Sequence, residues 1–217
     1  WSLMNNIKSS NVEKVFLTAS GGPFRNLPIN KFKHITTKQA LNHPSWSMGK
    51  KISIDSATMM NKVFEIIEAK KIFNFRYSQL DILVHPKSYV HAMVKFSNGL
   101  TKILIHETDM KIPISNSLNS PFEKKIKSKK IDFNTLNNLD FQKIDLKRFP
   151  IVKLIKHLPN RDSLFETVIV SANECLVENF LNKKIKFLDI SKFLLKITQS
   201  KKFQKYKLKK PINIEEI

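Results

Sequence analysis

The chain has 217 residues, of which 41% are hydrophobic, so it can form one large domain or about one and a half ordinary ones. Its single cysteine, Cys175, excludes an internal disulfide and a cysteine-based metal site, and it predicts a reducing, cytoplasmic location. No apolar run is long enough to span a bilayer, and the start of the sequence does not resemble a signal peptide. The formal charge of +20 comes from lysines spread along the whole chain beside abundant Asn, Ile and Phe and only 4 glycines, a composition that A/T-rich codons explain better than nucleic-acid binding does.

The first predicted strand leads into a glycine turn. Glu13–Thr18 has the pattern of a buried strand, and Ser20, Gly21 and Gly22 follow it closely. Two adjacent glycines let the backbone turn sharply and bring its N–H groups close to a ligand. An ordinary tight turn is the alternative, and the motif alone does not separate the two.

The stretch His43–Lys51 is predicted to be a loop, because Pro44 blocks a helix and Gly49 permits a bend. Loops normally avoid large exposed apolar side chains, yet this one carries Trp46 and Met48. Either these side chains pin the loop to the core, or the loop closes over a ligand as a lid.

The next stretch, Lys51–Phe73, reads as a strand, a turn and an amphipathic helix. Ile52–Asp55 alternates apolar and polar residues, which predicts a strand. Asp55 or Ser56 can cap the helix that follows. Its apolar residues repeat at helical spacing, at Met60, Val63, Phe64 and Ile67.

Three polar residues of this helix, Asn61, Lys62 and Glu65, are spaced to share one patch in its first two turns. With the Ser56 hydroxyl, an amide, an ammonium group and a helix N-terminus suit a phosphate. The carboxylate one turn further on suits a metal or a proton. The alternative is a capped helix with a surface Lys–Glu pair, since such pairs are common and weak.

The pattern then returns to strands. Leu80–His85 is predicted to be a strand, and Ser88–Phe96 and Leu100–His106 a hairpin joined by Asn98-Gly99. His91 lies on one face of this hairpin, where it can serve a site or be a satisfied histidine of the sheet.

The last part of the chain is predicted to be mostly helical. Glu107–Ile114 is expected to be irregular, and the polar, basic residues from 119 onward a connection. Three helices follow, over 151–157, over 163–182 with Ser163 and Glu166 in capping-box spacing, and one that Asp189 or Ser191 caps. The predicted fold class is therefore α+β, an α/β-like domain with a mixed sheet and flanking helices, followed by a small α-helical bundle.

Five blocks of the sequence are characteristic in this order. They are SGGPF at Ser20–Phe24, HPSWSMGKKISIDSATMMNK at His43–Lys62 with Glu65 after it, HPKSYVH at His85–His91, TDM at Thr108–Met110 and SANE at Ser171–Glu174. Together they resemble the 1-deoxy-D-xylulose 5-phosphate reductoisomerase family. The resemblance covers nearly the whole chain, and its second block is long and specific.

The resemblance implies an NADPH-dependent and divalent-metal-dependent rearrangement and reduction of 1-deoxy-D-xylulose 5-phosphate to 2-C-methyl-D-erythritol 4-phosphate, in non-mevalonate isoprenoid biosynthesis, by a homodimer. It implies that Glu65, His43 and His91 are catalytic and that Glu65 is a ligand of magnesium or manganese. It implies that the cofactor lies against Gly49 and Met110. Substrate binding is implied for Ser20, His43, Ser56, Asn61, Lys62, Trp46 and Met48, the last two in a mobile flap.

The resemblance also implies parts that these 217 residues do not contain. Complete members carry an N-terminal Rossmann domain for NADPH and a D-S-E-H segment with two further metal carboxylates. A single carboxylate does not make a strong site for a hard divalent cation. We therefore expect an incomplete catalytic domain in residues 1–118, a connection in 119–146 and a helical domain in 147–217, inactive when tested alone. A non-catalytic remnant and a basic nucleic-acid-binding protein are the two competing hypotheses.

Overall fold

The computed structural model describes residues 2–4, 7–44, 48–118, 125–130 and 132–212. The chain forms two compact units that interleave in sequence. Unit 1 consists of Trp1–Ser20 and Ile72–Ile144, and unit 2 consists of Gly21–Lys71 and Asp145–Ile217. The domain boundaries expected after residues 118 and 146 stay predictions.

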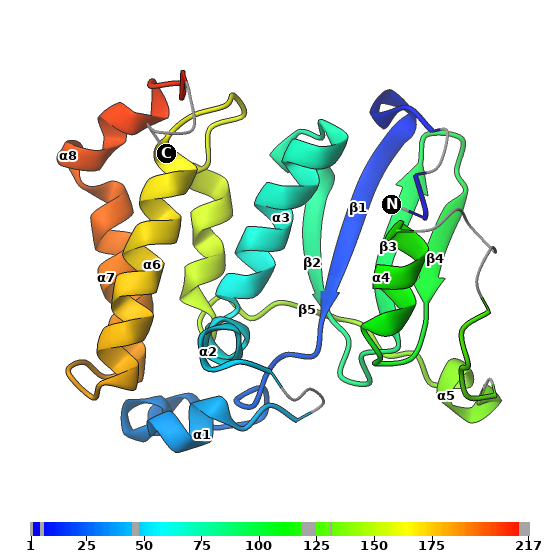
Figure 1. Ribbon diagram of the computed structural model, residues 1–217, viewed down its shortest axis with the longest axis horizontal. Coiled ribbons are helices and arrows are strands. Elements are labelled where there is room, and N and C mark those ends of the chain that lie inside the picture. Colours follow the sequence, from blue (N-terminus) through cyan, green and yellow to red (C-terminus); the bar gives the residue numbers. More distant parts are fainter. Residues whose placement is uncertain (1, 5–6, 45–47, 119–124, 131, 213–217) are drawn as a thin grey trace. The chain divides into compact units, whose positions relative to one another are not determined.

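Unit 1 is built on a mixed sheet with the strand order β4-β3-β1-β2-β5 (Figure 1). Its strands are β1 (Val12–Ala19), β2 (Leu80–Val84), β3 (Val90–Phe96), β4 (Thr101–Ile105) and β5 (Gln142–Lys143). β1 pairs in parallel with β2 and antiparallel with β3, and these central strands bury Val15, Ile82 and Val94. The predicted strands over 13–18 and 80–85 are confirmed.

The predicted hairpin of β3 and β4 is confirmed as well. Gly99 in its turn has φ +87°, a conformation that side chains with a Cβ rarely adopt. The short helical segments of unit 1 are η1 (Ser9–Asn11), η3 (Tyr77–Gln79) and α5 (Phe133–Asn137).

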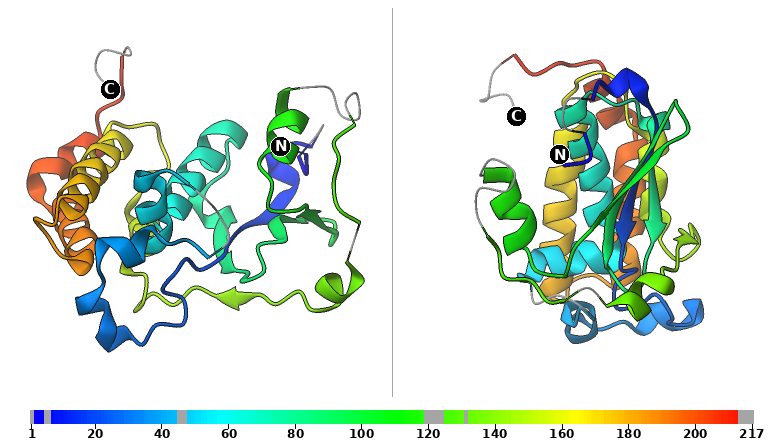
Figure 2. Two further views of the ribbon diagram at one scale, coloured as in Figure 1. Left: turned by 60° about the horizontal axis from the view of Figure 1, so that its bottom comes forward. Right: turned by 90° about the vertical axis from the view of Figure 1, so that its right-hand side faces the viewer.

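A helix, α4 (Lys111–Leu118), occupies part of the stretch that the sequence predicted to be irregular, so that prediction is wrong from residue 111 onward. Pro113 is the third residue of the helix, where the backbone N–H has no partner within the helix and its absence does little harm. The Asp109 carboxylate accepts a 2.9 Å hydrogen bond from the Lys111 N–H at the helix start. α4 lies over one face of the unit 1 sheet (Figures 1 and 2).

Unit 2 is helical. Its elements are η2 (Ile29–His34), α1 (Thr37–Leu41), α2 (Lys50–Thr58), α3 (Met60–Phe73, of which the last two residues fall in unit 1), η4 (Pro150–His157), α6 (Phe165–Leu181), α7 (Phe187–Gln199), α8 (Lys201–Gln204) and η5 (Lys205–Lys207). α6 and α7 pack side by side (Figures 1 and 2). Between them and η4 lie fully buried side chains, among them Leu154, Ile169 and Leu194.

The strand predicted over Ile52–Asp55 is wrong, because these residues form the middle of α2. Strand alternation would place Ile52 and Ile54 on the same face, but Ile52 is 41% exposed and Ile54 is 0% exposed. Burial instead follows Ser53, Ile54, Ala57 and Thr58, the spacing of a helix face. Asp55 and Ser56 therefore do not cap a helix but lie inside one.

Met59 separates α2 from α3. Its backbone is left-handed, with φ +70°, which ends α2. The Thr58 hydroxyl donates to the Ile54 carbonyl at 3.0 Å and accepts from the Met60 N–H at 3.3 Å, so it bridges the break. The break places Asn61 and Lys62 in the first turn of α3.

The helix starts of the C-terminal bundle differ in detail from the predictions. Ser163 and Glu166 meet as their spacing predicts, but the hydroxyl donates to the carboxylate at 2.5 Å, and α6 begins only at Phe165. Of the two caps predicted for α7, Ser191 lies inside the helix and does not cap it. Asp189 caps from within the first turn, since its carboxylate accepts from the N–H of the N-cap residue Lys186 at 2.9 Å.

The mixed sheet, its flanking helices and the C-terminal bundle confirm the predicted α+β class. In the described part of the chain, no helix has both the length and the apolar character that crossing a bilayer requires.

Candidate functional site

The three polar residues predicted to share a face of α3 do so, and we call Asn61, Lys62 and Glu65 the α3 patch. The Asn61 Nδ2 donates to Glu65 Oε1 at 2.6 Å. The Lys62 Nζ donates to Glu65 Oε2 at 2.6 Å. The Lys62 and Glu65 side chains are 17% and 32% exposed, so solvent reaches both charged groups. Each carboxylate oxygen thus has a donor of its own.

This arrangement can exchange partners with a ligand. An anion that binds Lys62 and Asn61 competes with Glu65 as their acceptor. The released carboxylate is then free to accept a proton or to bind a cation. The α3 patch is therefore suited to a ligand that brings a negative group and a positive group to neighbouring positions.

The glycine turn approaches α2 closely within unit 2. Gly22 has φ +64°, and a Cβ added to it would lie 3.0 Å from the Ser56 carbonyl oxygen and 3.4 Å from the Ala57 Cα. Only glycine fits this approach without a shift of the backbone. The candidate segments at Gly21-Gly22 and at Ser56 are thus in contact, while Ser20 ends the first stretch of unit 1.

Asp55, the residue before Ser56, forms a buried polar pair with Asn173 that was not predicted. Asp55 is 2% exposed and Asn173 of α6 is 0% exposed, and the Asn173 Nδ2 donates to Asp55 Oδ1 at 2.8 Å. Lys51 forms an ion pair with Asp55 Oδ2 at 2.9 Å. Burial raises the pKa of Asp55 above its usual range, although the bonds from Asn173 and Lys51 act in the opposite direction.

The loop between α1 and α2 carries four further candidates. Trp46 lies outside the described residues. Met48 and Gly49 directly precede α2, and the Gly49 carbonyl accepts from the Ser53 N–H at 3.1 Å and from its hydroxyl at 2.9 Å. His43 is half-buried, and burial lowers its pKa below the usual range of histidine, which keeps the ring neutral near pH 7.

In unit 1, His91 is held by a second histidine, His106, that the sequence did not suggest. The rings are stacked, with centroids 3.5 Å apart and planes 9° apart. A carbonyl oxygen only accepts hydrogen bonds, so His91 donates from Nε2 to the His106 carbonyl at 3.0 Å. The register of β3 and β4 shifts between Val90 and Ala92, so His91 is the bulged residue, and such bulges re-aim a side chain.

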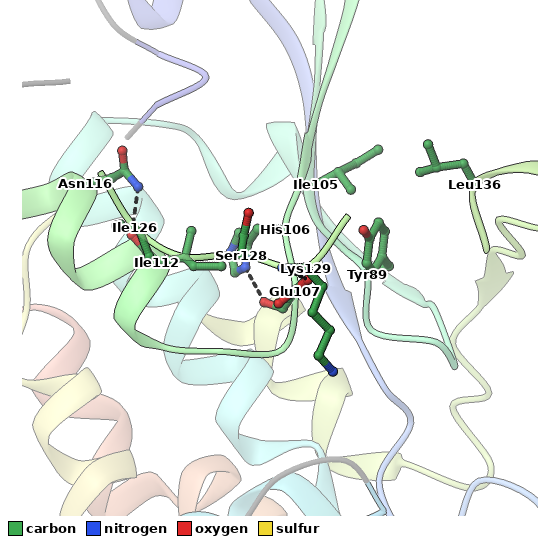
Figure 3. Close-up of a pocket in the computed structure, with 10 residues that line it drawn as sticks. All are labelled: Tyr89, Ile105, His106, Glu107, Ile112, Asn116, Ile126, Ser128, Lys129 and Leu136. Atoms are coloured by element: carbon green, nitrogen blue, oxygen red, sulfur yellow. Dashed lines mark hydrogen bonds between the residues drawn. The ribbon is translucent and has the colours of Figure 1, made fainter. Parts of the chain in front are cut away.

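His106 also lines a cavity of about 420 Å³ in unit 1. Figure 3 shows the residues around this space, most of which come from the end of β4, from α4 and from the segment after it. The lining includes the polar residues Glu107, Ser128 and Lys129 and the apolar residues Ile105, Ile112 and Ile126. Met110 precedes α4 and is 53% exposed, and it does not line the cavity.

The candidate residues divide between the two units. Ser20, His91 and Met110 lie in unit 1, whereas His43, Met48, Gly49, Ser56 and the α3 patch lie in unit 2. Within the described ranges, no three His, Cys, Asp or Glu side chains are grouped as a metal site. Magnesium takes about six oxygen ligands. Among the described residues, Glu65 can therefore supply one ligand of such a site, but the described residues do not supply its full set of ligands.

Comparison with protein families gives two matches. The model of the 1-deoxy-D-xylulose 5-phosphate reductoisomerase C-terminal domain matches residues 1–73. The model of the DXP reductoisomerase C-terminal domain matches residues 105–217.

Known proteins give the same result. The chain is 64% identical to the 1-deoxy-D-xylulose 5-phosphate reductoisomerase of Pelagibacter ubique (strain HTCC1062), over 100% of this chain and 56% of that protein. A crystal structure of DOX-P reductoisomerase in complex with NADPH, fosmidomycin and magnesium is similar with TM-score 0.81 and 38% identity, over 91% of this chain and 48% of that one. The Zymomonas mobilis enzyme in complex with NADPH has TM-score 0.81 and 36% identity, over 96% of this chain and 52% of that one. The chain thus spans about half the length of these relatives.

Proposed function

This chain belongs to the 1-deoxy-D-xylulose 5-phosphate reductoisomerase family, and from that premise we propose that it forms the substrate-holding part of an enzyme that converts 1-deoxy-D-xylulose 5-phosphate to 2-C-methyl-D-erythritol 4-phosphate. The observation that carries the proposal is the α3 patch, whose ammonium and amide groups sit at a helix start beside a releasable carboxylate. The ammonium and amide groups of this patch suit the phosphate of a sugar, and its carboxylate suits a divalent cation.

In this proposal the phosphate is held by Ser20, Ser56, Asn61 and Lys62. The ammonium group of Lys62 supplies the positive charge, and the hydroxyl and amide groups supply directional hydrogen bonds. His43 and His91 line the sugar site in this proposal. Burial lowers the pKa of His43, which favours its neutral form, and the stacked ring of His106 fixes the orientation of His91. Trp46 and Met48 close over the substrate and exclude water.

The proposed cofactors are NADPH and magnesium or manganese, as solved relatives contain NADPH and magnesium. Gly49 and Met110 are the proposed contacts of the nicotinamide. Glu65 is the proposed metal ligand of this chain, and a bound divalent ion would polarise the substrate carbonyl. Because one carboxylate is too few for such an ion, we expect the 217-residue chain alone to leave NADPH unoxidised.

A chimera tests the proposal. The part of the Pelagibacter ubique enzyme that this chain does not match is fused to this chain, and NADPH oxidation is followed with 1-deoxy-D-xylulose 5-phosphate and magnesium. We expect magnesium-dependent turnover from the chimera and none from the chain alone. The matched control is the chimera with Glu65→Gln, which should fold and be inactive. A folded chimera without turnover would favour the non-catalytic remnant instead.

We also propose that the protein acts as a homodimer in the cytoplasm and has no specific nucleic-acid partner. In the described residues β4 is an edge of the sheet, and it exposes Ile103 (43%) and Ile105 (38%). Exposed apolar edge strands favour pairing with a second copy. Sedimentation of the wild type and of Ile103→Lys tests the dimer, which the lysine should weaken.

The proposed location rests on the single cysteine. An exposed free thiol at Cys175 suits a reducing compartment.

A further inference from the structure

The buried pair Asp55–Asn173 is not required by any step of the proposed reaction, and its chemistry does not favour burial. A buried carboxylate raises the free energy of the fold, and a well-packed apolar pair is often as stable as a buried polar one. The Asn173 Oδ1 has no hydrogen-bond partner within the described part of the chain, which adds a desolvation cost. A polar pair kept in such a place calls for a reason other than stability.

The pair joins elements that are far apart in the sequence. Asn173 and Asp55 are separated by 118 positions, and their bond ties α6 to the last turns of α2. The carboxylate only accepts hydrogen bonds, so the amide nitrogen of Asn173 must face it, and this fixes the orientation of the amide. Lys51 completes the anchor from the first turn of α2.

From this anchor a continuous path of bonds leads to the α3 patch. Ser56 follows Asp55 in the chain, and its carbonyl accepts from the Met59 N–H at 3.2 Å. The Met59 carbonyl in turn accepts from the Lys62 N–H at 3.2 Å. The same Ser56 carbonyl is the group that Gly22 approaches. The position of α2 on α6 thus sets the positions of Ser56, of the left-handed Met59 and of the first turn of α3.

We propose that Asp55 and Asn173 are positioning residues of the phosphate site, which hold Ser56, Met59 and Lys62 in the geometry that receives the anion. The proposal rests on the proposed function for the identity of the ligand. Its physical core, the dependence of the α2–α3 break on Asn173, does not rest on that function.

The test uses the 217-residue chain, inorganic phosphate and two measurements. Phosphate affinity is read from the amide NMR shifts of Ser56, Asn61 and Lys62, and local opening from the hydrogen exchange of the Met59 and Lys62 amides. We expect Asn173→Ala to weaken phosphate binding about tenfold, the equivalent of one charge-assisted hydrogen bond. Exchange at Met59 and Lys62 should rise by a similar factor.

The matched control is Thr198→Ala in α7. Thr198 is 1% exposed, and its hydroxyl donates only to carbonyls of its own helix, those of Leu194 and Leu195. This change also removes a buried hydrogen bond, so it lowers stability, but it should leave phosphate affinity and exchange at Met59 unchanged. Equal effects of the two variants would overturn the proposal, since a general loss of stability would then explain both.

Two further variants keep the test decisive. Asp55→Asn retains an acceptor for Asn173 and should keep phosphate affinity within about twofold, whereas Asp55→Leu should not. If Asn173→Ala does not fold, Asn173→Ser replaces it, because its shorter side chain does not reach the carboxylate. If wild-type chain shows no phosphate-induced shifts, the proposed function fails, and hydrogen exchange at Met59 and Lys62 still decides the positioning role.

Discussion

The α3 patch and the Asp55–Asn173 pair place similar groups, an amide and a carboxylate, in opposite settings. The patch is built from residues at most four positions apart and stays partly exposed. The pair spans 118 positions and is buried. Water screens the patch, so its bonds contribute little to stability and can be exchanged with a ligand. Nothing screens the pair, so its bond is expensive to break and suited to holding a backbone in place.

This comparison separates binding from scaffolding within a few residues of chain. If it is right, changes in the patch alter ligand affinity with little effect on the free energy of unfolding. Changes in the buried pair should mainly lower the free energy of unfolding.

The largest loss is expected for Asn173→Ala, about 2–4 kcal/mol, because it leaves the buried Asp55 carboxylate without its buried donor. The matched control is Asn179→Ala in the same helix, whose exposed amide bonds only to the Cys175 carbonyl and sulfur one turn away. That change should cost less than about 0.5 kcal/mol. Urea denaturation of the two variants measures the difference, and similar losses would show that the buried bond has no special weight.

The next largest loss is expected for Gly22→Ala. Its left-handed backbone disfavours alanine by about 1–2 kcal/mol, and the clash with the Ser56 carbonyl adds to this. Gly99→Ala is the control, because Gly99 also has a positive φ but nothing within 4 Å of an added Cβ. The difference between the two midpoints in urea isolates the close approach. If both variants lose the same amount, the glycine turn does not press on α2.

The sequence predicted what local geometry determines. The α3 patch follows from helical spacing, and the hairpin follows from Asn98-Gly99, since both involve neighbours in the chain. The strand over 52–55 failed because four alternating residues fit a strand and a small-residue helix face equally well. A strand would require Ile52 to pack on the same buried face as Ile54, but in the structure the Ile52 side chain is 41% exposed.

Long-range features were not predictable in the same way. No spacing rule connects Asp55 to Asn173, because their contact exists only once α2 lies on α6. The stack of His91 on His106 likewise requires the bulge that separates Val90 from Ala92, and the register of a hairpin with a bulge does not follow from its turn alone. A polar residue in the middle of a long amphipathic helix, such as Asn173, is the position whose conservation an alignment would have to test.

Substitutions in the α3 patch should change the free energy of unfolding by less than about 0.5 kcal/mol. Their effects on phosphate affinity should be opposite in sign. Lys62→Ala should weaken binding by about tenfold or more, because it removes the cation. Glu65→Gln should strengthen it, because the amide competes less well than a carboxylate for Lys62. Calorimetric titration with inorganic phosphate distinguishes these outcomes, and weaker binding in Glu65→Gln would contradict the exchange of partners.

The smallest effect is expected from the pH dependence of His43. Burial lowers the pKa of this ring, so the unfolded chain binds a proton at a higher pH than the folded chain does. Stability is therefore lost as the pH falls from above the ordinary histidine pKa toward the lowered one. His43→Gln should remove this part of the loss, while the other five histidines remain as a common background. Melting temperatures of both proteins at pH 7.5 and 5.5 give the comparison, and an equal drop in each would mean that His43 does not stay neutral in the fold. A smaller drop in the variant would place His43 with Asp55 among the groups that the fold buries at a cost, and apart from the exchangeable charges of the α3 patch.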